Sequence, residues 1–415
     1  MNRDRRTWRG AVPALLSEIN TMLVLRDVWT NGPLSRAELS RRTGLSKPTV
    51  SKIVQALVER GLVEAAGQND GSPQGGRRAR LFRFNPEAGF VLVCVVHEGH
   101  LEGALGDCSA RFLERFRLHF DVTSAPDEVI GAAVERFKIL LDRYPDTLRR
   151  LIGVGVSLPG IADHESGEAI YVPGLPNWCN YNVADPFERA FGVDVVVENE
   201  SRLMASAEHW FGVAQGVDNF VSISIGEGTG GAVFIDGRLW RGASYLAGEI
   251  GHMRLDTGGG SRQPEPPINS QVAAWAFVDR AMELARRDPE GQLAGQIARG
   301  ERPEVGHVFE AARADDEAAR RAVSDLGYYL GLLIGNALLH YDVPLVVIHG
   351  PYAQGGSLLL DAIYETLDTW FMPQVPRNTE ICYSGIEKDI ELVGATSVLL
   401  QQTFAMGTSM RTRGR

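Results

Sequence analysis

Apolar residues near the start of the chain recur at helical spacing, which predicts helices that pack on one face. The first helix covers 18–30, and Asn-Gly-Pro at 31–33 ends it, since glycine suits the C-terminal cap and proline follows. Ser35 and Glu38 have the spacing of a capping box, in which each side chain satisfies a backbone N–H. The capping box predicts a second helix that ends near Thr43.

A third helix is predicted after a tight turn at Gly44-Leu45, with Ser46 as its cap and Pro48 in its first turn. The apolar positions of this helix predict a buried face of Val50, Ile53, Val54, Leu57 and Val58. The other face is polar and suited to the phosphates and base edges of a DNA major groove. The predicted DNA contacts of this helix-turn-helix are Ser46, Lys47, Thr49, Ser51 and Lys52.

A hairpin is predicted next to the third helix. Residues 62–64 have the pattern of a strand, 66–76 are rich in turn-forming residues, and 77–84 predict a returning strand. We expect this hairpin to be the wing of a winged helix-turn-helix. The basic residues at its root suit a phosphate or a narrow minor groove, and they are Arg77, Arg78 and Arg80.

From Phe90 onward the pattern changes to short apolar strands that alternate with amphipathic helices, which indicates an α/β architecture. The predicted strands are 90–96, 101–107, 152–160, 193–200, 220–239 and 345–351. The predicted helices are 127–143, 270–287, 303–320, 320–340 and 355–371. A division near residue 200 suggests two lobes around a cleft.

The charge distribution separates the basic N-terminal region from the rest. The 415-residue chain has a net charge of −10, yet residues 1–85 carry about +8 and the remainder about −18. A basic head on an acidic body fits a DNA-binding domain joined to a small-molecule sensor. The chain has no run of 18 apolar residues and no secretory signal, so we expect a cytoplasmic protein without a membrane partner. Its four cysteines form no CxxC pair, and we expect neither a disulfide nor a metal site.

Several segments carry a resemblance to a known family. They are SRAELSRRTGLSKPTVSKIVQALVERGLV at 35–63, VGVSLPGIAD at 154–163, LPNWCN at 175–180, VVVENESRLMASAEHWFG at 195–212 and SIGEGTGGAVFIDGRLWRGASYLAGEIGHM at 224–253. The chain resembles the ROK family of repressors and sugar kinases, and within it the xylose and N-acetylglucosamine repressor type. The resemblance implies a winged helix-turn-helix at 1–86 and a two-lobed, actin-like ATPase fold. Lobe 1 would cover 87–200 with a C-terminal return at about 385–405, and lobe 2 would cover 201–415.

The resemblance also implies a sugar site. In the family kinases an Asn-Asp pair binds sugar hydroxyls and its Asp is the catalytic base, whereas here the pair is Asn199-Glu200. The longer Glu side chain suits hydroxyl recognition better than proton abstraction, because displacement of about 1 Å costs about a hundredfold in rate. An exposed acid at a helix start is the alternative for Glu200. The full set of ligand-binding residues that the resemblance implies is Gly160, Asn177, Asn199, Glu200, Glu249 and His252.

Two departures from the family pattern bear on catalysis. The His of GEIGHM binds zinc in most family members together with a downstream cysteine motif, but RLDTGGGSRQPEPPINS contains no cysteine. The kinase phosphate loop, Asp-x-Gly-Gly-Thr, is replaced by VCVVHEGHLEG at 93–103, in which Gly99 alone fits. Phosphoryl transfer depends on positioning and charge stabilisation by such a loop. We therefore expect no catalytic residue and no cofactor. The glycines of 226–231 are retained, and two roles stay open for them: phosphate binding or tight backbone geometry.

These observations favour a DNA-binding transcriptional regulator that represses carbohydrate-metabolism genes and responds to a sugar or sugar derivative. Its partners would be a double-stranded operator, the effector, and a second copy in a homodimer or homotetramer. One alternative is a sugar kinase with an accessory DNA-binding domain. Another is a regulator whose C-terminal domain serves dimerisation alone.

Overall fold

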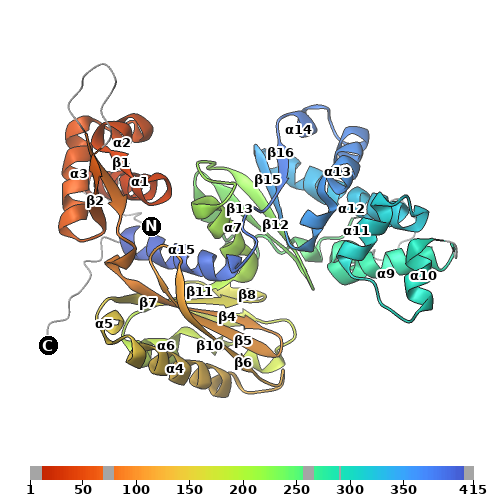
Figure 1. Ribbon diagram of the computed structural model, residues 1–415, viewed down its shortest axis with the longest axis horizontal. Helices are drawn as coiled ribbons and strands as arrows, with labels where there is room; N and C mark the ends of the chain where they lie inside the picture. The colour runs from red at the N-terminus through yellow and green to blue at the C-terminus, as the bar shows by residue number, and fades with distance from the viewer. Residues whose placement is uncertain (1–11, 69–78, 256–265, 289–290, 406–415) are drawn as a thin grey trace, which may run out of the picture. The chain divides into compact units, whose positions relative to one another are not determined.

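The computed structural model describes residues 12–68, 79–255, 266–288 and 291–405, which fold into two compact units (Figure 1). Among the described residues, the first unit runs to Glu198 and resumes at Ala395, and the second is Asn199–Gly394. The predicted boundary at residue 86 lies inside the first unit. The predicted domain limits otherwise remain predictions.

The N-terminal part of the first unit is a three-helix module with a small sheet. Its helices are α1 (Val12–Asn31), α2 (Arg36–Thr43) and α3 (Lys47–Glu59). Strands β1 (Leu34–Ser35), β2 (Val63–Gln68) and β3 (Arg80–Phe84) pair in the order β1-β3-β2. The predicted helix-turn-helix and hairpin are therefore present, and β1 is an addition that the sequence pattern did not predict.

The helix starts follow from their capping residues. The Ser35 hydroxyl accepts a hydrogen bond from the Glu38 N–H, and the Glu38 carboxylate accepts one from the Ser35 N–H at 2.8 Å. Gly44 closes α2 in the left-handed conformation, with φ of 70°. Four of the five predicted core residues of α3 are buried, namely Val50, Ile53, Val54 and Leu57.

The remainder of the first unit is built on a five-stranded sheet of order β11-β7-β4-β5-β6. Its strands are β4 (Phe90–His97), β5 (His100–Asp107), β6 (Phe112–His119), β7 (Leu151–Leu158) and β11 (Asp194–Asn199). Helices α4 (Pro126–Arg143), α5 (Pro145–Leu148) and α6 (Ala184–Phe191) lie along this sheet (Figure 1). Phe137 of α4 and Phe187 of α6 are completely buried in the shared core.

A smaller three-stranded sheet, β10-β9-β8, also belongs to the first unit. It consists of β8 (Ile161–Asp163), β9 (Glu168–Tyr171) and β10 (Tyr181–Asn182), with the short helix η2 (Pro176–Trp178) between the last two. Another short helix, η1 (Pro86–Ala88), precedes β4.

The second unit contains a five-stranded sheet of order β14-β13-β12-β15-β16 and most of the helices. The strands are β12 (Phe220–Ile225), β13 (Thr229–Ile235), β14 (Arg238–Trp240), β15 (Leu345–His349) and β16 (Glu380–Tyr383). The helices include α7 (Glu200–Phe211), α9 (Ala274–Ala285), α10 (Gln292–Ala298), α11 (Val305–Arg313), α12 (Glu317–Tyr341) and α13 (Gly356–Trp370). Shorter helices are η3 (Ile250–His252), α8 (Asn269–Val272), η4 (Pro351–Gly355) and α14 (Gln374–Arg377).

Two predicted helix limits in this unit are wrong. The helix expected at 270–287 is divided into α8 and α9, because Ala273 has an extended conformation with ψ of 152°. The helix expected at 303–320 ends at Arg313, because Asp316 caps the next helix by accepting a hydrogen bond from the Ala319 N–H at 2.9 Å. Strands β6, β8 to β10 and β16 and helix α10 were not predicted.

Helix α12 is long and apolar enough to cross a membrane by length and composition. Its apolar side chains, however, belong to the core of the second unit, where Leu326, Leu330 and Ile334 are 2% exposed or less. We therefore assign α12 as a core helix.

Candidate functional site

Helix α3 presents a polar face opposite its buried face. Ser46, Lys47, Ser51 and Lys52 are exposed, and Thr49 is half-buried. The Ser46 hydroxyl caps the helix by accepting a hydrogen bond from the Thr49 N–H, and the two hydroxyls lie 2.8 Å apart. Short polar side chains near a helix start, with two lysines beside them, can contact base edges and phosphates.

The described part of the hairpin contributes further cationic groups. Arg80 is exposed, and its guanidinium lies 5.6 Å from the centre of the Phe82 ring. Arg36, at the start of α2, lies over the same ring at 4.4 Å and was not predicted as a site residue. Arg77 and Arg78 lie outside the described residues. Stacking on an aromatic ring holds a guanidinium in place without neutralising its charge.

The predicted effector residues of the second unit begin where β11 leads into α7. Asn199 is the N-cap of α7, and its side-chain oxygen accepts hydrogen bonds from the N–H groups of Ser201 at 2.9 Å and Arg202 at 3.2 Å. The capping geometry fixes the direction of the next side chain, Glu200, at the first position of the helix. The oxygen of Asn199 therefore has a structural role that the sequence reasoning did not predict.

Glu200 is not the exposed helix-start acid that we considered as an alternative, because it is partly buried. Burial raises the pKa of its carboxyl to about 8, and the nearby carboxylates of Glu391 and Glu249 act in the same direction. Glu200 is consequently protonated at neutral pH, and a protonated carboxyl can donate as well as accept a hydrogen bond. The structure thus brings Glu200 and Glu249 close enough to interact electrostatically.

The loop that carries Glu249 is held by Arg202, a residue that the sequence reasoning missed. Arg202 is 1% exposed, and its Nη2 donates hydrogen bonds to the carbonyl oxygens of Tyr245 at 2.5 Å and Ala247 at 3.0 Å. Such burial is unusual for an arginine, and it is visible only in the folded structure. By fixing 245–247, Arg202 positions Glu249 two residues later.

Glycines bring this loop against the β12–β13 hairpin. A side chain on Gly248 would overlap the carbonyl oxygen of Gly231, and one on Gly251 would overlap that of Thr229. On the hairpin itself, a side chain on Gly230 would overlap the Ser201 hydroxyl at the start of α7. A side chain on Gly226 or Gly228, by contrast, would meet nothing within 4 Å, so close packing accounts for only some of the hairpin glycines.

The other predicted effector residues have different surroundings. His252 is exposed at the end of η3, and Glu249 is half-buried. Gly160 and Asn177 belong to the first unit. Gly160 has φ of 89° and packs against the Tyr171 backbone, and the Asn177 amide donates a hydrogen bond to the Thr123 carbonyl oxygen at 2.6 Å. Both residues therefore have a structural role in the first unit.

The segment that replaces the kinase phosphate loop is a tight hairpin between β4 and β5. Gly99 has φ of 77°, and the Glu98 side chain lies against Gly174, where a larger residue would overlap it. His97 and His100 flank the turn as directly paired residues. Burial lowers the pKa of both imidazoles, the positive charge of Arg117 acts in the same direction, and the Glu102 carboxylate opposes it.

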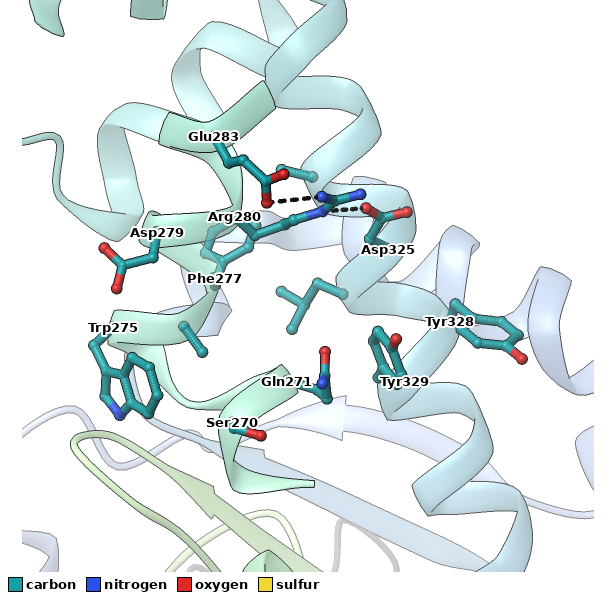
Figure 2. A pocket seen from close by; sticks show the side chains of 13 residues that line it. Ser270, Gln271, Trp275, Phe277, Asp279, Arg280, Glu283, Asp325, Tyr328 and Tyr329 are labelled. Atoms are coloured by element: carbon teal, nitrogen blue, oxygen red, sulfur yellow. Dashed lines mark hydrogen bonds and ion pairs between the residues drawn. The ribbon is translucent and has the colours of Figure 1, made fainter. Parts of the chain in front are cut away.

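A separate cavity of about 670 Å³ lies between α9 and α12 and was not predicted (Figure 2). In it the Arg280 guanidinium donates hydrogen bonds to Asp325 at 2.8 Å and Glu283 at 3.0 Å. None of the predicted effector residues lines this cavity. We therefore regard it as distinct from the candidate effector site.

Comparison with known proteins covers both parts of the chain. The ROK family model matches residues 98–402, and the MarR family model matches residues 22–71. The xylose repressor of Bacillus subtilis strain 168 is 26% identical over 396 residues, which cover 95% of this chain and 98% of that protein. The N-acetylglucosamine repressor of Escherichia coli O157:H7 is 25% identical over 384 residues, which cover 90% of each chain.

Solved structures with a similar fold fall into two groups. A ROK family transcriptional regulator, a homologue of the Escherichia coli MLC protein, has a TM-score of 0.79 and 24% identity, covering 96% of this chain and 100% of that chain. A ROK family glucokinase from Streptomyces griseus has a TM-score of 0.60 and 22% identity, covering 75% of this chain and 100% of that chain. Because the ROK family model spans most of the chain, the protein belongs to the ROK family.

Proposed function

We propose that this chain is a transcriptional repressor that binds operator DNA, and that a bound sugar or sugar derivative changes its affinity for the operator. The observation that carries the proposal is the exposed polar face of α3, in a winged helix-turn-helix that precedes a ROK domain. Two relatives of nearly full length are named as sugar repressors. With this function we expect the protein to be cytoplasmic and its target genes to belong to carbohydrate metabolism.

The effector site would be formed by Glu200 and Glu249, with Asn199 and His252 beside them. A protonated Glu200 can donate a hydrogen bond to a ligand oxygen, while an ionised carboxylate accepts from ligand hydroxyls. Such mixed donors and acceptors suit a polyhydroxylated ligand and disfavour analogues that lack the hydroxyls. For Gly160 and Asn177, which belong to the first unit, a ligand contact stays a prediction of the family resemblance.

A second copy of the chain would supply the second DNA-binding head. Two heads in a homodimer or homotetramer would contact half-sites separated by whole helical turns. Effector binding would then change operator affinity by favouring one arrangement of the heads over another.

Replacement of Lys52 by alanine should test the DNA-binding face. We expect weaker operator binding and a slope of log affinity against log salt that is less steep by about 1, because one phosphate contact is lost. Fluorescence anisotropy at several salt concentrations would measure both. The matched control is Lys138→Ala, since Lys138 is exposed on α4 and pairs with Glu135 at 2.7 Å. Equal binding by Lys52→Ala and Lys138→Ala would contradict the assignment.

Replacement of Glu249 by glutamine should test the effector site. We expect wild-type protein to be stabilised in a thermal shift panel by at least one sugar or sugar phosphate, and Glu249→Gln to bind that ligand at least about tenfold more weakly, since a charged hydrogen bond is worth about 1.5–3 kcal/mol. Glu310→Gln, at an exposed position of α11, should bind normally. If no ligand in the panel stabilises the wild-type protein, the alternative of a dimerisation domain without an effector is favoured.

A further inference from the structure

Three potential metal ligands gather at the hairpin that replaces the kinase phosphate loop. His97 ends β4, His100 begins β5, and the two face each other across the turn. Glu102 follows on the same side of β5 as His100, because alternate residues of a strand share a face. The intervening Leu101 points to the other face, where it is completely buried.

The three side chains are already close to one another. One ligand atom from each of His97, His100 and Glu102 lies within 4.8 Å of the others. The two imidazole rings are stacked with centroids 4.6 Å apart, and His100 Nε2 lies 3.8 Å from Glu102 Oε1. All three are half-buried, so solvent can reach them. Tetrahedral ligands at bond lengths of about 2.1 Å lie about 3.4 Å apart, so small side-chain rotations would complete a site.

The backbone beneath the cluster is well fixed. Strands β4 and β5 pair in antiparallel fashion along their whole length, and the other edge of β5 pairs with β6. The Glu98 side chain packs against Gly174, which holds the tip of the turn. Two ligands on opposite strands of a fixed hairpin lose little conformational entropy when they bind a common ion.

We propose that His97, His100 and Glu102 bind a divalent transition-metal ion of the zinc type, with water at the remaining positions. Two imidazoles and one carboxylate are a ligand set that suits Zn²⁺ and its neighbours, and they disfavour Mg²⁺ and Ca²⁺, which require mainly oxygen ligands. The turn that stands in place of the kinase phosphate loop would thus hold a metal ion. The expectation of no metal site rested on missing cysteines, and the H-x-x-H-x-E spacing was the signal available instead.

Arg117 is the main competitor for Glu102. It lies opposite Glu102 on β6 and donates a hydrogen bond to Glu102 Oε1. A carboxylate has two oxygens with about four lone-pair positions, so Glu102 can keep the Arg117 hydrogen bond on Oε1 and bind the ion through a remaining lone pair. A hydrogen bond from a residue that does not itself bind the metal, here Arg117, also orients the metal-binding side chain.

The test uses full-length, tag-free protein that has been stripped with chelator and titrated with Co²⁺ and Zn²⁺. We expect one bound ion per chain, visible absorption bands with Co²⁺, and a higher melting temperature with Zn²⁺. The double variant His97→Ala/His100→Ala should lose more than about a hundredfold in affinity, because loss of a residue that merely orients a ligand already costs about 10–100-fold. Unchanged stoichiometry and affinity in that variant, or no binding by the wild type, would overturn the proposal.

Two further variants guard against a folding artefact. His340→Ala removes an exposed histidine of the second unit and should bind the ion as the wild type does. Glu102→Gln retains the shape of the side chain and should weaken binding by at least about tenfold while operator binding without metal is unchanged. If Glu102→Gln binds the ion as tightly as the wild type, the carboxylate is not a ligand and the three-residue site is wrong.

Discussion

Burial decides the chemistry of Glu200 more than its residue type does. The family resemblance placed Glu200 and Glu249 in one ligand site, but it did not foresee that burial, aided by the carboxylates of Glu391 and Glu249, would raise the pKa of Glu200 to about 8. These neighbours come from segments far apart in the chain. Because the charged form is disfavoured, a regulator site can hold a hydrogen-bond donor where the family kinases place a base.

The raised pKa of Glu200 predicts a pH-dependent stability. The folded state holds the Glu200 proton more tightly than the unfolded state, whose pKa is near 4.5, so the free energy of unfolding should fall as pH rises from about 5 to about 8. Glu200→Gln should show a smaller fall, measured by urea denaturation across this range. Glu310→Gln should match the wild type. An identical pH profile for Glu200→Gln would show that this carboxyl is ionised in the folded protein.

At the scale of single elements, helix starts that depend on neighbouring residues were predicted. Short strands that depend on pairing with distant segments were not. The starts of α2 and α3 follow from Ser35 and Ser46, whose side chains bond to backbone N–H groups a few residues away. Strands β1 and β16 are edge elements of 2 and 4 residues, and such short segments have no periodicity to detect. Their pairing partners lie far away in the sequence, so only the folded sheet reveals them.

Loss of the α2 cap should loosen one element without touching the DNA-binding face. Ser35→Ala removes the capping box at a cost of about 1 kcal/mol, which corresponds to roughly fivefold faster hydrogen exchange in α2. Hydrogen–deuterium exchange of residues 36–43 would measure this change. Ser51→Ala, on the exposed face of α3, should leave the exchange of α2 unchanged and weaken operator binding instead. The cap would be unimportant if Ser35→Ala exchanged at the wild-type rate.

For the whole molecule, the uneven charge separates two tasks. The basic N-terminal 85 residues attract DNA, while the acidic remainder repels it, which limits DNA contact to the N-terminal part. The α/β class and the order of its main elements were predictable because hydrophobic periodicity is local. The return of the chain to the first lobe was implied by the family resemblance alone, because hydrophobic periodicity carries no signal of such a return.

Coupling between DNA and effector should be reciprocal. If the effector changes operator affinity by a coupling free energy of about 1–3 kcal/mol, operator DNA must change effector affinity by the same factor of about 5–150. Calorimetric titration of the effector with and without operator would measure it. DNA of equal length and unrelated sequence is the control. Equal effector affinity in the presence and absence of operator would rule out coupling.

The way in which the second unit is connected has a consequence for the evolution of specificity. Residues 199–394 are one continuous insertion, and its last residue, Gly394, packs against the backbone of Leu203 near its first, where a larger side chain would overlap the Leu203 carbonyl oxygen. A segment whose ends meet can be exchanged as a cassette with little disturbance of the host fold. Recombination at these two junctions would give a lineage of regulators that inherit one operator while acquiring new ligands.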